Sequence, residues 1–113
     1  MANKHRGEVA LQLDKKRKLK FNTHALVELE DALGMPFSKL NEETIGFGAI
    51  AKMFWASLLH EIPDLTLPEA HMLMDLAPFA TISEKVMEAF SLAFPEANEE
   101  KKEKVVEIGA GKS

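Results

Sequence analysis

The spacing of the apolar residues changes near residue 21 from every second position to every third or fourth. The stretch EVALQLDKKRKLKF, residues 8–21, has apolar side chains at alternating positions: Val9, Leu11, Leu13, Leu19 and Phe21. Alternation is typical of a strand with one buried face, and the polar break Asp14–Arg17 predicts a β-hairpin. Because an isolated hairpin is only marginally stable in water, we expect its apolar face to pack on helices.

The first two helices are predicted from capping residues and from helical apolar spacing. Asn22 or Thr23 can accept a hydrogen bond from an unpaired backbone N–H and start a helix that Gly34 ends. A connector with one short turn is expected over residues 36–44. The second helix is expected over residues 46–61, with a strong apolar face and small residues behind it. We therefore predict that this second helix is the central one.

Two Thr-x-x-Glu sequences predict the starts of the last two helices. In such a capping box, the Thr and Glu side chains each bond an unpaired backbone N–H. The first box runs from Thr66 to Glu69 and the second from Thr81 to Glu84. The sequence thus predicts a mainly α-helical α+β domain over residues 7–95, with an N-terminal β-hairpin packed on a bundle of about four short helices.

Charge is unevenly placed along the chain of 113 residues, which contains no cysteine. Residues 1–20 carry seven Lys and Arg against two acidic residues, whereas residues 21–113 carry seven against sixteen, a balance of −9. An acidic body disfavours contact with phosphates, so nucleic acid is not expected as a partner. No apolar stretch is long enough to span a membrane. Residues 96–113, charged and poor in large apolar side chains, are expected to form a flexible tail.

One helical stripe carries the residues closest to a chemical site. His24, Glu28 and Asp31 share a face of the first predicted helix, opposite its leucines. Zinc needs three or four ligands, and no other segment supplies a partner pair, so we interpret the stripe as solvated surface. His60 and His71 are too far apart in sequence for a zinc-protease motif. We predict no catalytic residue, no metal ligand and no cofactor; a hydrolase or metal-dependent enzyme that uses the stripe is one rival hypothesis.

Methionine and phenylalanine provide the candidate partner contacts. Five methionines follow the first residue, and methionine suits adaptable binding surfaces as well as cores. Met72 lies off the main apolar face of its predicted helix, which makes it the best candidate for contact with a partner. Phe90 and Phe94 are predicted to serve either as core or as docking residues.

Three phrases of the sequence resemble a known family. FNTHALVELEDALG, FWASLLHEIPDLTLPEA and FSLAFPEA follow the hairpin in an order similar to that of the tail assembly chaperones of siphophage-like particles, the family that includes the tenth product of the gene transfer agent cluster. The similarity covers residues 7–96. The hairpin turn, DKKRK, departs from the short, glycine-containing turn of that family.

The resemblance implies a non-enzymatic chaperone of a phage, prophage or gene-transfer-agent tail. Such a protein binds the tape measure protein, and works with other tail assembly proteins, in the cytoplasm of the bacterial host. The family has no assigned catalytic residues to carry over. Two alternatives stay open, a structural subunit of the phage-like tail and a small helical protein-interaction module, and so does assembly into a homo-oligomer.

Overall fold

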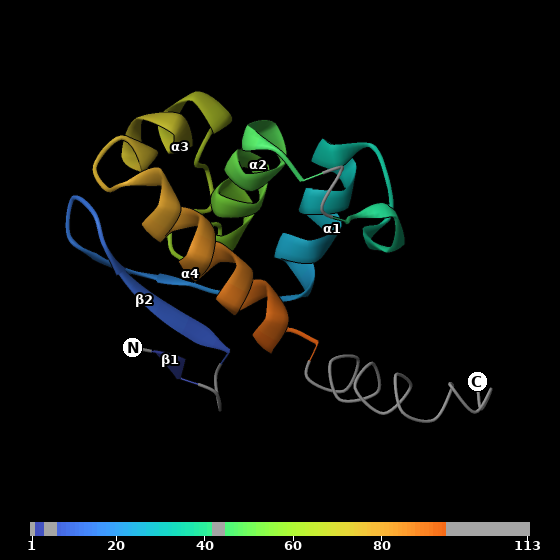
Figure 1. The fold of residues 1–113 in the computed structure, drawn as a ribbon, viewed down its shortest axis with the longest axis horizontal. Helices are drawn as coiled ribbons and strands as arrows, with labels where there is room; N and C mark the ends of the chain where they lie inside the picture. Colours follow the sequence, from blue (N-terminus) through green and yellow to red (C-terminus); the bar gives the residue numbers. More distant parts are fainter. Residues whose placement is uncertain (1, 4–6, 42–44, 95–113) are drawn as a thin grey trace.

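A computed structural model of the chain describes residues 2–3, 7–41 and 45–94, which form an antiparallel sheet followed by four α-helices (Figure 1). The elements are β1 (Ala2–Asn3), β2 (Glu8–Gln12), β3 (Lys16–Leu19), α1 (Thr23–Leu33), the 3₁₀ turn η1 (Phe37–Lys39), α2 (Phe47–Ser57), α3 (Leu67–Met74) and α4 (Phe79–Leu92). The helix α4 packs on β2 and β3, and α2 contacts β3 and the other three helices. The predicted mainly α-helical α+β fold is confirmed.

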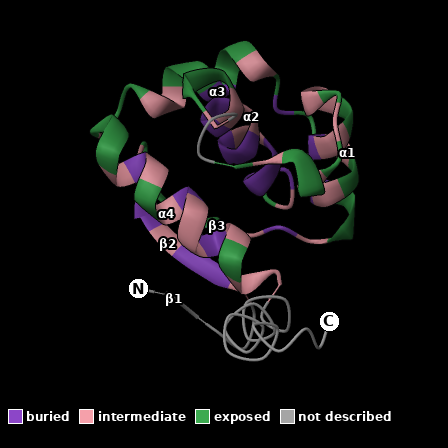
Figure 2. Ribbon diagram, turned by 45° about the vertical axis from the view of Figure 1, so that its right-hand side comes forward, coloured by how far each residue is buried: buried purple, intermediate pink, exposed green. Residues whose placement is uncertain are grey.

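The hairpin of β2 and β3 buries the apolar side chains that alternate in the sequence. Val9 pairs with Leu19, and both side chains are fully buried. Leu11 and Phe21 are buried as well, so the predicted inward face is confirmed. Buried residues run along β2 and through α2 (Figure 2). The two-residue strand β1, too short for alternation to reveal it, adds a third strand beside β2.

The hairpin turn is shorter than the predicted polar break. Gln12 pairs with Lys16, so the strand resumes while the sequence is still polar, and Arg17 lies within β3. The guanidinium of Arg17 lies 2.8 Å from a carboxylate oxygen of Asp14 and 3.4 Å from one of Glu61. A charged residue is tolerated on this strand because two carboxylates balance its charge.

The helix α2 is the centre of the packing, as predicted, but it ends earlier than predicted. It contributes buried side chains along most of its length, including Met53 and Phe54, which are fully buried. It ends at Ser57, because Leu58 and Leu59 donate to carbonyls three residues back, and the free Ser57 carbonyl accepts the N–H of Lys20 at 3.0 Å. In a longer helix that carbonyl would accept the N–H of Glu61, which bonds elsewhere.

The predicted caps of α1 and α3 are confirmed. Asn22 accepts the N–H of Ala25 at 2.9 Å, and Gly34 ends α1 with a φ of 71°, a conformation that favours glycine. Thr66 and Glu69 form the complete capping box of α3. The short turn expected in the connector is η1.

The predicted start of α4 is wrong. The helix begins at Phe79 directly after Pro78, whose carbonyl accepts the N–H of Ile82 at 3.1 Å. Pro78 is the N-cap residue, with an extended ψ of 141°, and without an N–H it cannot donate a helical bond that would extend the helix toward the N-terminus. Thr81 and Glu84 therefore lie inside the helix and form no capping box.

The described part of the chain ends two residues after α4, which itself ends at Leu92. The predicted tail, residues 96–113, lies outside the described residues, and so does residue 95, the predicted end of the domain. The helix α4 brings its first turn next to the start of α2, and this junction forms the surface considered next.

Candidate protein-docking surface

Large apolar side chains are exposed mainly near the start of α2, on α3 and at the start of α4. Among the described residues, five large hydrophobic side chains are exposed: Val27 59%, Phe47 74%, Met72 65%, Leu76 53% and Phe79 37%. Val27 is on α1, whereas the other four belong to the region from α2 to α4. Exposed apolar side chains that gather in one place mark contact surfaces.

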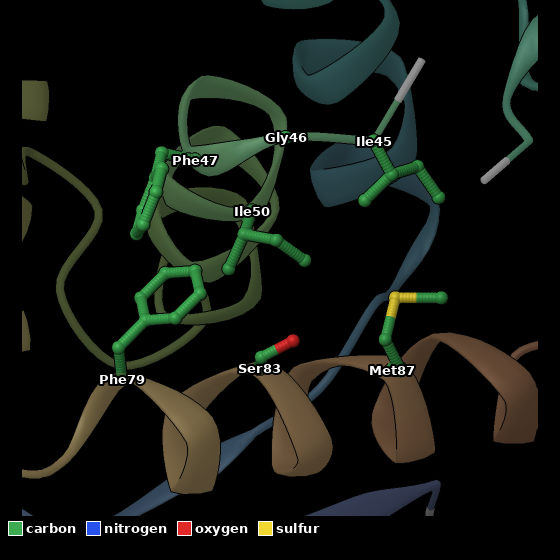
Figure 3. A pocket seen from close by; sticks show the side chains of 7 residues that line it. All are labelled: Ile45, Gly46, Phe47, Ile50, Phe79, Ser83 and Met87. Atoms are coloured by element: carbon green, nitrogen blue, oxygen red, sulfur yellow. The ribbon is translucent and has the colours of Figure 1, made fainter. Parts of the chain in front are cut away.

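The rings of Phe47 and Phe79 touch across the junction of α2 and α4. Their centroids are 4.5 Å apart, and the ring planes are inclined by 45°. Figure 3 shows Phe47 pointing from α2 and Phe79 pointing from α4 toward each other. We name this pair the Phe47–Phe79 ridge.

Two hollows flank the ridge, and both rings line each of them. The Ser83 hollow, about 400 Å³, is completed by Ile45, Gly46, Ile50, Ser83 and Met87 (Figure 3). The Asp75 hollow, about 540 Å³, is completed by Gly48, Ala51, His71, Met74, Asp75 and Ala77. Together, the ridge and its two hollows form the docking surface.

Helical geometry explains why the two hollows lie on opposite sides of Phe47. An α-helix turns by about 100° per residue, so Gly46 and Ile50 lie on one flank of Phe47. By the same rotation Gly48 and Ala51 lie on its other flank. The first pair lines the Ser83 hollow and the second lines the Asp75 hollow. The ring of Phe47 therefore separates them.

The local sequence leaves the ridge bare. Gly46 and Gly48 flank Phe47, and a Cβ added at either glycine would meet nothing within 4 Å. Side chains at these positions would project into the open space beside the ring. Pro78 ends the α3–α4 connection and starts α4, which places Phe79 in the first position of the helix. Two glycines and one proline thus present two aromatic rings to solvent.

The partner contacts predicted from sequence lie elsewhere. Met72 is exposed on α3 but does not line either hollow. Phe90 packs against Phe21, Phe37 and Phe94, with centroids 5.3, 5.5 and 5.1 Å away. These edge-on contacts join α4 to the hairpin end and to η1, which is a packing role. A docking role for Met72, Phe90 and Phe94 stays a prediction.

Sequence reasoning missed the importance of Phe47 and Phe79. Helical apolar spacing over residues 46–61 predicts that Phe47 lies on the apolar face of the second helix, where it would be buried. The sequence features that could have indicated exposed rings are the glycine on each side of Phe47 and the proline before Phe79. Small or rigid neighbours cannot cover a ring, so an aromatic residue in that setting favours exposure.

The helical stripe of His24, Glu28 and Asp31 does not form a metal site. His24 and Asp31 are exposed on α1, and Glu28 is half-buried. No three His, Asp or Glu side chains of the described residues are placed to hold a metal ion together. Glu30, on the same helix, accepts the N–H of Phe37 at 2.9 Å and fixes the connector after α1.

The histidine and glutamate that follow α2 close the outer edge of β3. His60 Nε2 lies 2.6 Å from the Lys18 carbonyl oxygen, and since a carbonyl only accepts, Nε2 carries the proton. Glu61 accepts the Lys18 N–H at 3.3 Å, and Ser57 accepts the N–H of Lys20. These bonds occupy the backbone groups with which another strand would pair.

The hairpin turn contains the clearest electrostatic coupling. The Arg17 guanidinium donates to both carboxylate oxygens of Asp14, at 2.8 and 3.1 Å. Chiefly through this hydrogen bonding, Arg17 lowers the pKa of Asp14 below its ordinary 3.8, and Asp14 raises the pKa of Arg17. This pair stabilises the turn and lies apart from the residues that line the docking surface.

Comparisons with models of protein families, with curated proteins and with solved structures found no match to this chain. Within the described ranges, each helix is too short or too polar to cross a membrane. What the chain does is therefore inferred from its own residues and their geometry.

Proposed function

We propose that the chain is a non-enzymatic assembly chaperone of a phage-like tail, in a phage, a prophage or a gene transfer agent. It binds the tape measure protein during tail morphogenesis in the cytoplasm of the bacterial host. Two features support this proposal: the resemblance over residues 7–96 and the mainly helical fold. The observation that carries it is the exposed Phe47–Phe79 ridge with a mainly apolar hollow on each side.

A docking surface of this kind suits an amphipathic helix, which places its apolar face against a hydrophobic surface. Phe47 leaves about three-quarters of its surface uncovered. Covering it removes about 150 Å² from water, which is equivalent to about 3–4 kcal/mol before the costs of association. One ring can therefore act as a major anchor for a helix that would otherwise aggregate through its apolar face.

Co-expression with a tape measure protein from the same genome tests the proposal. The soluble fraction of the tape measure protein is measured with no chaperone, with the wild-type chain and with Phe47→Ser. Val27→Ser serves as the matched control, because Val27 is also exposed but lies on α1. We expect solubility with the wild type and with Val27→Ser, and a marked loss with Phe47→Ser. A tape measure protein that is equally insoluble with and without the chain contradicts the proposal.

Purified particles distinguish a chaperone from a structural subunit of the tail. A chaperone leaves the assembly, so quantitative mass spectrometry of mature particles should find the chain absent or scarce. A stoichiometric copy number relative to the tube protein would instead identify a subunit.

A further inference from the structure

We infer that the docking surface selects a cationic amphipathic helix, with two apolar anchors one helical turn apart on either side of the Phe47–Phe79 ridge and a Lys or Arg beside Asp75. This inference rests on the proposed function, because it takes the surface as a site for a helix. It adds the chemistry of the bound segment.

The ridge sets the spacing of the anchors. Carbon atoms packed on opposite faces of one ring lie about 7–8 Å apart, twice the usual carbon–carbon contact distance. On a helix, side chains at i and i+4 have Cβ atoms about 5–6 Å apart and can splay to that separation. Side chains at i and i+7 are about 10 Å apart along the axis, which leaves a gap on each side of the ring. Anchors at i and i+4 therefore fit one into each hollow.

The charges around the docking surface determine whether the bound segment should be positively or negatively charged. Asp75 is the only residue with a formal charge among the described residues that line the hollows, and His71 is the only other titratable one. Residues 21–94 carry three lysines against eleven Asp and Glu, a balance of −8, so the helical body attracts cations as a whole. The lysine of α2, Lys52, is not among the lining residues. A segment rich in Asp or Glu is repelled, and one rich in Lys or Arg is attracted.

Two synthetic helical peptides test this inference without knowledge of the natural partner. In both peptides, leucines repeat at positions i and i+4. Every polar position is lysine in the first, the Leu/Lys peptide, and glutamate in the second, the Leu/Glu peptide. Their binding to the full-length chain is measured by fluorescence anisotropy in low salt and in about 0.5 M salt, where the Debye length falls to roughly 4 Å. We expect the Leu/Lys peptide to bind in both conditions and the Leu/Glu peptide to bind at least about tenfold more weakly in low salt.

Variants of the chain separate specific docking from general attraction to an acidic protein. Phe47→Ser should weaken binding of the Leu/Lys peptide by at least about tenfold at either salt concentration. Asp75→Asn should weaken it about two- to fivefold in low salt and little in high salt. The controls are Val27→Ser and Asp64→Asn, which remove an exposed apolar group and an exposed carboxylate outside the hollows. Circular dichroism confirms that each variant folds.

The outcomes separate this inference from the proposed function. Equal or tighter binding of the Leu/Glu peptide overturns the charge selection, and the tape measure co-expression still tests the chaperone. Binding of the Leu/Lys peptide that is unchanged in Phe47→Ser shows that the ridge is not the site and overturns the inference. A dimer of the chain alone that dissociates in Phe47→Ser assigns the surface to a second copy and also overturns it.

Discussion

The contact between Phe47 and Phe79 predicts a measurable coupling in a double-mutant cycle. A phenylalanine side chain exposes about 200 Å² when free, so Phe47, at 74% exposed, buries about 50 Å² and Phe79, at 37%, buries about 125 Å². At about 25 cal/mol per Å², Phe47→Ala costs about 1 kcal/mol and Phe79→Ala about 2–3 kcal/mol of unfolding free energy, as upper values. Because the rings touch, the double variant should cost about 0.5–1 kcal/mol less than the sum.

Urea denaturation of the wild type, the two single variants and the double variant measures these values, with unchanged m-values as the check on two-state unfolding. A cost above about 3 kcal/mol for Phe47→Ala would mean that the ring is buried in the folded protein. Strict additivity would mean that the rings do not touch. Either result would refute the description of an exposed, preformed ridge.

Three further predictions concern the hairpin and the helix caps. Glu61→Ala removes the acceptor of the Lys18 N–H, so hydrogen exchange at that amide, followed by NMR, should accelerate about fivefold. Thr66→Ala loses a cap and should lower the unfolding free energy by about 1 kcal/mol, whereas Thr81→Ala, inside α4, should show no capping loss. The pKa of Asp14 is lowered by its arginine partner, so Asp14 stabilises the fold above pH 3.8 and this contribution disappears on further acidification. Thermal melts of wild type and Asp14→Asn should therefore differ near neutrality and converge in acid.

The parts of the fold that depend on residues close together in the sequence could be predicted. Alternation at Val9, Leu11 and Leu19 identified the buried face of the hairpin. Successive side chains of a strand point to opposite faces, so the pattern depends only on neighbouring residues. The caps at Asn22 and Thr66 were predictable for the same reason, since each cap bonds a backbone group three residues away. Such features need no knowledge of the tertiary structure.

The features that sequence did not reveal depend on contacts between distant segments. The bond from the Lys20 N–H to the Ser57 carbonyl joins the residue after β3 to the last residue of α2, far along the chain. The residues from Thr81 to Glu84 have the pattern of a capping box, but α4 begins earlier, directly after Pro78. Exposure of Phe47 depends on how α2 meets α4, and helical spacing alone assigns that residue to the core. The docking surface therefore had to be found from the structure.

Site-specific photo-crosslinking tests the central claim most directly. A benzophenone amino acid replaces Phe47 in one protein and Val27 in a matched control, and each is co-expressed with the tape measure protein and irradiated. We predict a crosslink to the tape measure protein from position 47 and none from position 27, with the attached peptide carrying lysine or arginine next to paired apolar residues. A soluble tape measure protein that crosslinks from position 27 but not from position 47 would contradict the account.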